Sequence, residues 1–273
     1  MEPQLLHRVA DSVATVVVHR PDKRNAMTAA MWRALPPLLD TLAADPGVRA
    51  LVLTGEGDTF CAGADISTLR GSPAEAQRLA VAAEEALAAF PRPTLAAVRG
   101  HCVGGGAQLA AACDLRFAAG DALFGVTPAK LGIVYPASST RRLVSLVGPA
   151  AAKYLLFSGE LIDAERALRT GLVDEVLPGG AELDARVAEF TAVLASRSQL
   201  TQAAAKEFAN GRTDRDDHWA RLADGNADTA EGVDAFLERR RPRFTWRTPA
   251  ADGSREPSAT KTRPPMEKKP TSR

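Results

Sequence analysis

The 273-residue sequence has few cysteines and no dominant sign of charge. Cys61, Cys102 and Cys113 are not paired by spacing, and with four scattered histidines they form neither a C-x-x-C nor an H-x-x-x-H metal pattern. The formal net charge of +1 provides no overall field that would attract nucleic acid or an anionic membrane. These features predict a reduced protein without a metal and without a nucleic-acid partner.

Long hydrophobic runs are also missing. No apolar segment approaches the roughly 20 residues needed to cross a bilayer. The first ten residues lack the basic segment followed by a hydrophobic one that is typical of a secretory signal. We therefore expect a cytoplasmic protein that has no membrane partner. Apolar residues make up 45% of the chain, which is enough for the core of one large domain or two small ones.

Short β-branched segments alternate with helical patterns before residue 140, as expected of an α/β protein. Thr28 is positioned to cap a helix that Pro36 and Pro37 should kink or split. The segments expected as strands are 13–20, 48–54, 95–98 and 114–118, and those expected as helices include 73–90 and 104–112.

After residue 140 the pattern becomes mainly helical. Helices are expected over 150–157, 163–169, 181–195, 199–210 and 216–240, with a strand-like segment at 173–177. The last 27 residues hold five prolines, seven basic and three acidic residues and no aromatic residue, so they cannot bury enough apolar surface to order themselves. We predict a core over 1–195, a helical C-terminal region over 196–246 and a disordered tail over 247–273.

Two glycine-containing segments have the composition of a ligand site. Residues 60–66, F-C-A-G-A-D-I, are small enough for a ligand to approach the main chain closely. Residues 104–106 are three glycines between a strand and a helix, so the first N–H groups of that helix have no intrahelical partner. Such a terminus suits a developing negative charge. Neither P-loop nor G-x-G-x-x-G spacing is present, which argues against a nucleotide phosphate site.

Taken together, the motifs resemble those of the crotonase superfamily of enoyl-CoA hydratases and isomerases. The resemblance covers roughly residues 13–244 and rests on Asn25-Ala26, F-C-A-G-A-D-I at 60–66, G-H-C-V-G-G-G-A-Q-L at 100–109, A-C-D-L at 112–115 and Phe124-Gly125. It implies an α/β fold of the ClpP/crotonase type, a spiral of ββα units with a helical C-terminal trimerisation region. It also implies a homotrimer or homohexamer that acts on an acyl-CoA, with coenzyme A as part of the substrate and no permanently bound cofactor.

The resemblance also implies roles for individual residues. The backbone N–H groups of Ala64 and Gly105 would hold the thioester oxygen as it becomes an enolate. The residues implied as coenzyme A contacts are Arg24, Ala26, Ala62, Asp65 and Ile66, together with the C-terminal pair Phe236 and Arg239.

The sequence departs from the hydratase pattern at both acid–base positions. Hydratases place glutamates where this chain has Gln108 and Pro128, and neither side chain can exchange a proton near pH 7. Two-glutamate hydration is therefore not expected, although Gln108 could position a water molecule. One alternative is a malonyl- or methylmalonyl-CoA type decarboxylase, because the segment around Tyr135 resembles methylmalonyl-CoA decarboxylase. Another is a non-catalytic acyl-CoA binding subunit.

Overall fold

The computed structural model describes residues 2–66 and 72–248. Six strands form the main sheet in the order β1-β2-β3-β4-β6-β9. β1 (Gln4–Ala10) pairs antiparallel with β2 (Val13–His19), and the others are parallel: β3 (Ala50–Gly55), β4 (Thr94–Val98), β6 (Leu115–Ala119) and β9 (Glu175–Leu177). A smaller sheet joins β5 (His101–Val103), β7 (Leu123–Gly125) and β8 (Ile162–Asp163).

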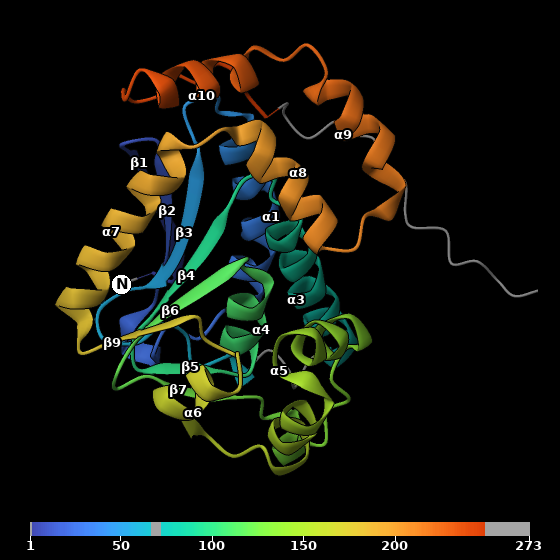
Figure 1. Ribbon diagram of the computed structural model, residues 1–273. Helices are drawn as coiled ribbons and strands as arrows, with labels where there is room; N and C mark the ends of the chain where they lie inside the picture. Colours follow the sequence, from blue (N-terminus) through green and yellow to red (C-terminus); the bar gives the residue numbers. More distant parts are fainter. Residues whose placement is uncertain (1, 67–71, 249–273) are drawn as a thin grey trace, which may run out of the picture.

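Helices cover both faces of the main sheet (Figure 1). On one face α1 (Ala29–Ala44), α3 (Pro73–Ala88) and α4 (Gly105–Ala112) enclose the larger hydrophobic core. On the other face α7 (Gly180–Ser196) packs Leu183 and Val187 against Val52, Leu95 and Phe117. The strands of the parallel sheet are buried on both sides, which explains their almost continuous apolar sequences.

Most of the expected elements are present, and the expected α/β class is confirmed. Thr28 caps α1, since its Oγ1 accepts the Met31 N–H at 3.2 Å. Of the kink or split expected at Pro36 and Pro37, the split is wrong: α1 continues through both prolines to Ala44. Packing of its buried face, which includes Leu35, Leu39 and Leu42, offsets the hydrogen bonds that the prolines cannot make.

The helical part of the chain also departs from the expected boundaries. The helix expected over 216–240 is two helices, α9 (Asp216–Ala223) and α10 (Ala227–Leu237), separated by Gly225, which has a positive φ of 70°. The helix expected over 150–157 is the end of α5 (Ala137–Ser158), which bends at Gly148. The expectations for α6 (Ala164–Arg169) and α8 (Gln199–Ala209) agree with the structure. Strands β1, β5, β7 and β8 were not expected.

The C-terminal segment returns to the helical region at least as far as Thr248. Trp246 packs near Trp219 of α9, with ring centroids 6.2 Å apart, and the Thr248 N–H donates to Gln199 Oε1 at 3.0 Å. The first two residues of the tail predicted over 247–273 are thus described, and the rest of that prediction lies outside the described residues. Within the described ranges, no helix is long and apolar enough to span a membrane.

Candidate active site

Asn25 fixes the loop that enters the site. Its side chain is fully buried, and its Nδ2 donates to the carbonyl oxygens of Thr59 at 2.5 Å and Glu56 at 2.9 Å. Its Oδ1 accepts the Arg20 N–H at 3.0 Å. A backbone φ of 57° at Asn25 suits asparagine, which tolerates the left-handed region better than most residues. One buried amide therefore joins the 20–27 loop to the turn after β3.

The segment 60–66 is held between that loop and β5. On one side, the Met27 N–H donates to Gly63 O at 2.8 Å, and the Asp65 N–H donates to Met27 O at 2.9 Å. On the other side, the Cys61 N–H donates to His101 O at 2.9 Å. These main-chain bonds need no particular side chain, so they fix the path of the segment through backbone geometry alone.

This arrangement brings the main chain of Ala64 to the first residue of α4. A Cβ atom built on Gly105 would lie 3.3 Å from Ala64 N and 2.8 Å from Cζ2 of Trp32, so the position has little room for a side chain. Among the described residues, neither the Ala64 N–H nor the Gly105 N–H donates to an acceptor. Two unpaired donors thus lie close together at a helix N-terminus, where the helix dipole also favours negative charge.

The predicted coenzyme A contacts in the N-terminal half belong to the two segments that carry or adjoin these donors. The Ala62 N–H donates to Arg24 O at 2.9 Å, which places Arg24 and Ala62 side by side. Asp65 pairs with Arg20, whose Nη1 lies 2.7 Å from Asp65 Oδ2 and 3.2 Å from Ala26 O. Ile66 follows directly and is 61% exposed, so its side chain is open to a ligand.

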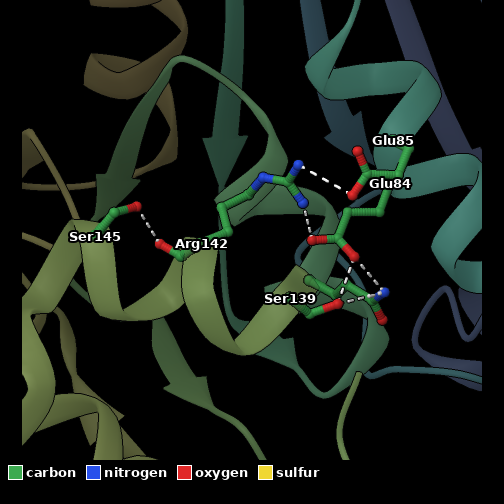
Figure 2. A network of polar contacts seen from close by, with 6 residues as sticks. Glu84, Glu85, Ser139, Arg142 and Ser145 are labelled. Atoms are coloured by element: carbon green, nitrogen blue, oxygen red, sulfur yellow. Dashed lines mark hydrogen bonds and ion pairs between the residues drawn. The ribbon is translucent and has the colours of Figure 1, made fainter. Parts of the chain in front are cut away.

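Gln108 lies one helical turn after Gly105, with 4% of its surface exposed. Its Nε2 donates to Glu84 Oε2 at 2.7 Å and to Ser139 Oγ at 3.1 Å. Ser139 Oγ also donates to Glu84 Oε2, and Arg142 forms an ion pair with Glu84 Oε1 (Figure 2). Three helices, α3, α4 and α5, therefore contribute to one buried polar network.

Glu84, Ser139 and Arg142 were not expected as site residues. One signal was available in the sequence: Ala80, Ala83 and Leu87 define the buried face of α3, and Glu84 falls within it by helical spacing. A glutamate on such a face needs a partner because an unpaired buried charge is costly. Its partners lie 24 to 58 residues away in the chain, and spacing along the sequence cannot identify them.

Pro128 and Tyr135 lie in the segment between β7 and α5. Pro128 opens the short 3₁₀ helix Pro128–Leu131, and Oγ1 of its neighbour Thr127 would lie 3.6 Å from a Cβ atom built on Gly104. Tyr135 lines a small cavity of about 10 Å³, together with Ala107, Phe124 and other core residues. Burial first, and then the nearby charge of Glu84, raise the pKa of Tyr135 above its usual value, so the phenol stays protonated.

Phe236 and Arg239 are not brought to the Ala64–Gly105 donors within this chain. Figure 1 shows α10, which carries Phe236, well away from α4 and β5. Phe236 is 82% exposed and lines a surface pocket of about 460 Å³ together with Leu200, Val233 and Phe244. Within the described part of the chain, no group of three or more His, Cys, Asp or Glu side chains could hold a metal ion.

Known proteins with related sequences and structures agree on one family. The model of the enoyl-CoA hydratase/isomerase family matches residues 8–247. A crotonyl-CoA hydratase of Syntrophomonas wolfei is 35% identical over 247 residues, which cover 86% of this chain and 95% of that protein.

Solved structures give the same result. A crystal structure of an enoyl-CoA hydratase/isomerase family member superposes with a TM-score of 0.83 at 38% identity, covering 90% of this chain and 99% of that one. An enoyl-CoA hydratase of Bacillus anthracis gives a TM-score of 0.80 at 30% identity, and the match covers 88% of this chain and 98% of that one.

The fold and the family match define an enzyme of the crotonase class, as the sequence resemblance implied. The chain belongs to the enoyl-CoA hydratase/isomerase family, whose enzymes act on acyl-CoA thioesters. The expected fold, a crotonase-type α/β spiral with a helical C-terminal region, is thereby confirmed. The decarboxylase and the non-catalytic binding subunit are not favoured by these matches.

Proposed function

We propose that this enzyme binds an acyl-CoA with the thioester oxygen between the N–H groups of Ala64 and Gly105 and stabilises the enolate form of the acyl group. The observation that carries the proposal is the close approach of these two main-chain segments, each with an unpaired donor. Donors fixed before the reaction cost no reorganisation as charge develops on the oxygen, and loss of one typically lowers the rate by about 10²–10³.

Coenzyme A is the part of the substrate that the remaining contacts would hold. Arg24, Ala26, Ala62, Asp65 and Ile66 form one edge of the site, and coenzyme A would enter along it. Phe236, on α10, and Arg239, two residues beyond the end of that helix, lie away from α4 and β5 within a single chain (Figure 1). We propose that they close over coenzyme A in an assembled trimer or hexamer, where α10 of another copy could reach the site.

The two-glutamate mechanism of hydration is not available to this site. Gln108 and the segment Thr127-Pro128-Ala129 provide no carboxyl group at the two positions concerned. Each general acid or base typically contributes about 10²–10⁴-fold to a rate. The reaction class is therefore enolate chemistry on an acyl-CoA, with hydration of a simple enoyl-CoA as a slow reaction at most.

Two measurements on the purified protein test this function. The carbonyl stretch of bound butyryl-CoA, followed by difference infrared spectroscopy with a ¹³C-labelled thioester, should move to lower frequency because two donors polarise the bond. Ala64→Pro, which removes one N–H, should reduce that shift. An unshifted carbonyl in the native complex, or no binding of butyryl-CoA, would contradict the proposal.

Crotonyl-CoA hydration by the native protein should have a kcat/KM far below the range of about 10⁶–10⁸ M⁻¹s⁻¹ reached by efficient enzymes. The matched control is an ordinary family hydratase assayed under the same conditions. Restoring the acids as Gln108→Glu with Pro128→Glu is a weaker test, since the carboxyl group introduced by Gln108→Glu would lie against the Glu84 carboxylate and one of the two would take up a proton. Efficient native hydration would show that another residue supplies the proton.

A further inference from the structure

Glu84 is a completely buried carboxylate that touches Gln108, the residue at the first acid–base position. Its Oε1 is paired with Arg142, and its Oε2 accepts the hydroxyl of Ser139 (Figure 2). Oε2 also accepts a hydrogen bond from Gln108 Nε2. The neighbouring Glu85 makes a single longer contact with Arg142, at 3.3 Å, and its side chain is half exposed. The two adjacent glutamates of α3 therefore differ in burial and in whether they contact Gln108.

The direction of every hydrogen bond in this network follows from the carboxylate. An ionised carboxylate can only accept, and a guanidinium can only donate. The Gln108 amide must therefore turn its NH₂ group toward Glu84, and both N–H bonds are used, one on Glu84 and one on Ser139. Ser139 accepts from Gln108 and donates its own hydroxyl proton to Glu84 Oε2.

This orientation leaves the carbonyl oxygen of Gln108 as the free end of the amide. None of the described residues donates a hydrogen bond to Gln108 Oε1. This oxygen is also not one of the fully buried polar atoms without a partner in the described residues, so part of its surface is accessible. Because α4 side chains lean toward the helix N-terminus, Gln108 extends over the turn that begins at Gly105. A donating N–H···carboxylate bond also polarises the amide and strengthens its oxygen as an acceptor.

We propose that Glu84 is a positioning residue that holds Gln108 as a hydrogen-bond acceptor beside the acyl group. As a result, the site prefers an acyl-CoA that carries a hydroxyl donor, such as a 3-hydroxyacyl-CoA, over the unsubstituted ester. This preference rests on the proposed enolate site, since it places the acyl chain next to the Ala64–Gly105 donors. Glu84 acts only through Gln108 and touches no substrate.

The substitution Glu84→Gln should reverse the amide. Arg142 offers only donors, so the new glutamine turns its oxygen toward Arg142 and its NH₂ toward Gln108 and Ser139. Gln108 must then turn its own oxygen inward and present NH₂ to the acyl group. The hydroxyl group of the ligand can still accept a hydrogen bond from this NH₂ group. The polarised Gln108 oxygen to which that hydroxyl donated no longer faces it.

Isothermal titration with butyryl-CoA and with each enantiomer of 3-hydroxybutyryl-CoA tests the proposal. The native protein should bind one hydroxylated enantiomer about tenfold more tightly than butyryl-CoA, the size expected of one net hydrogen bond. Glu84→Gln should lower this preference to about threefold or less, because a neutral NH₂ donor replaces the polarised acceptor, while butyryl-CoA still binds. Glu85→Gln is the matched control, and it should keep the tenfold preference because Glu85 does not contact Gln108.

Gln108→Met tests the acceptor separately, because it removes the amide and leaves Glu84 paired with Arg142 and Ser139. It should abolish the preference, which keeps the proposal testable if Glu84→Gln does not fold. Equal native binding of hydroxylated and plain esters would overturn the proposal, as would an undiminished tenfold preference in folded Glu84→Gln. Failure of the native protein to bind any of these esters would overturn the proposed function as well.

Discussion

At the scale of single residues, burial controls the chemistry of the cysteines. Cys61, Cys102 and Cys113 are free thiols with at most 4% of their surface exposed. Burial raises the pKa of Cys61 to about 11 and that of Cys113 to about 12, and it raises the pKa of Cys102 well above its usual value. A thiol without its thiolate form is a poor nucleophile.

We therefore expect no rapid reaction of the native protein with the thiol reagent DTNB at pH 8, and reaction of three thiols once guanidinium has unfolded the chain. Because the folded pKa values are raised, the free energy of unfolding should fall as the pH rises from about 9 toward 11, where unfolded thiols ionise and folded ones do not. A thiol that reacted within seconds in the native state at pH 8 would contradict this assignment.

At the scale of elements, Asp228 holds the C-terminal segment against α8 and α10. It is 4% exposed, and its Oδ1 accepts the N–H groups of Thr245 at 2.8 Å and Trp246 at 3.2 Å. Its Oδ2 accepts the hydroxyl of Ser198 at 2.8 Å. One carboxylate thus satisfies three donors from two segments far apart in the sequence.

Asp228→Ala should lower the free energy of unfolding by about 2–3 kcal/mol, because these partly buried donors would lose their acceptor. Urea denaturation followed by tryptophan fluorescence measures the change, since Trp219 and Trp246 both belong to this region. Asp224→Ala, at the exposed end of α9, is the matched control and should change stability by less than about 0.5 kcal/mol. Similar effects of the two substitutions would argue against the role of Asp228.

At the scale of the whole molecule, α10 presents apolar side chains to solvent. Val233 is 54% exposed, Phe236 82% and Leu237 72%, and they border the same surface pocket. Clustered exposed apolar residues are typical of an interaction surface. They support the trimer or hexamer that we propose for this family member.

Light scattering at micromolar concentration should give three or six times the chain mass of 28.8 kDa. Leu237→Asp should shift the distribution toward smaller species, because a charge would replace an apolar contact. The exposed Glu238→Gln substitution on the same helix end is the control and should leave the mass unchanged. A native protein of 28.8 kDa would exclude the proposed assembly.

The sequence determined the class of the protein because its local patterns carry that information. The alternation of strands and helices predicted the α/β class, and the motifs at 60–66 and 100–109 carried the family resemblance, which implied Ala64 and Gly105 as backbone donors. Main-chain donors depend little on side-chain identity, so a family motif can point to them, and their role as an oxyanion hole stays a prediction. The absence of glutamates at positions 108 and 128 was equally visible.

Only the tertiary structure revealed what surrounds Gln108. Glu84, Ser139 and Arg142 come from two helices that meet α4 in space, and no spacing in the sequence connects them. Nor could the sequence show that α1 continues through two prolines, since packing outweighs the local preference there. Local signals determined the backbone of the site, whereas long-range packing decided the side-chain contacts, because those depend on which helix faces come together.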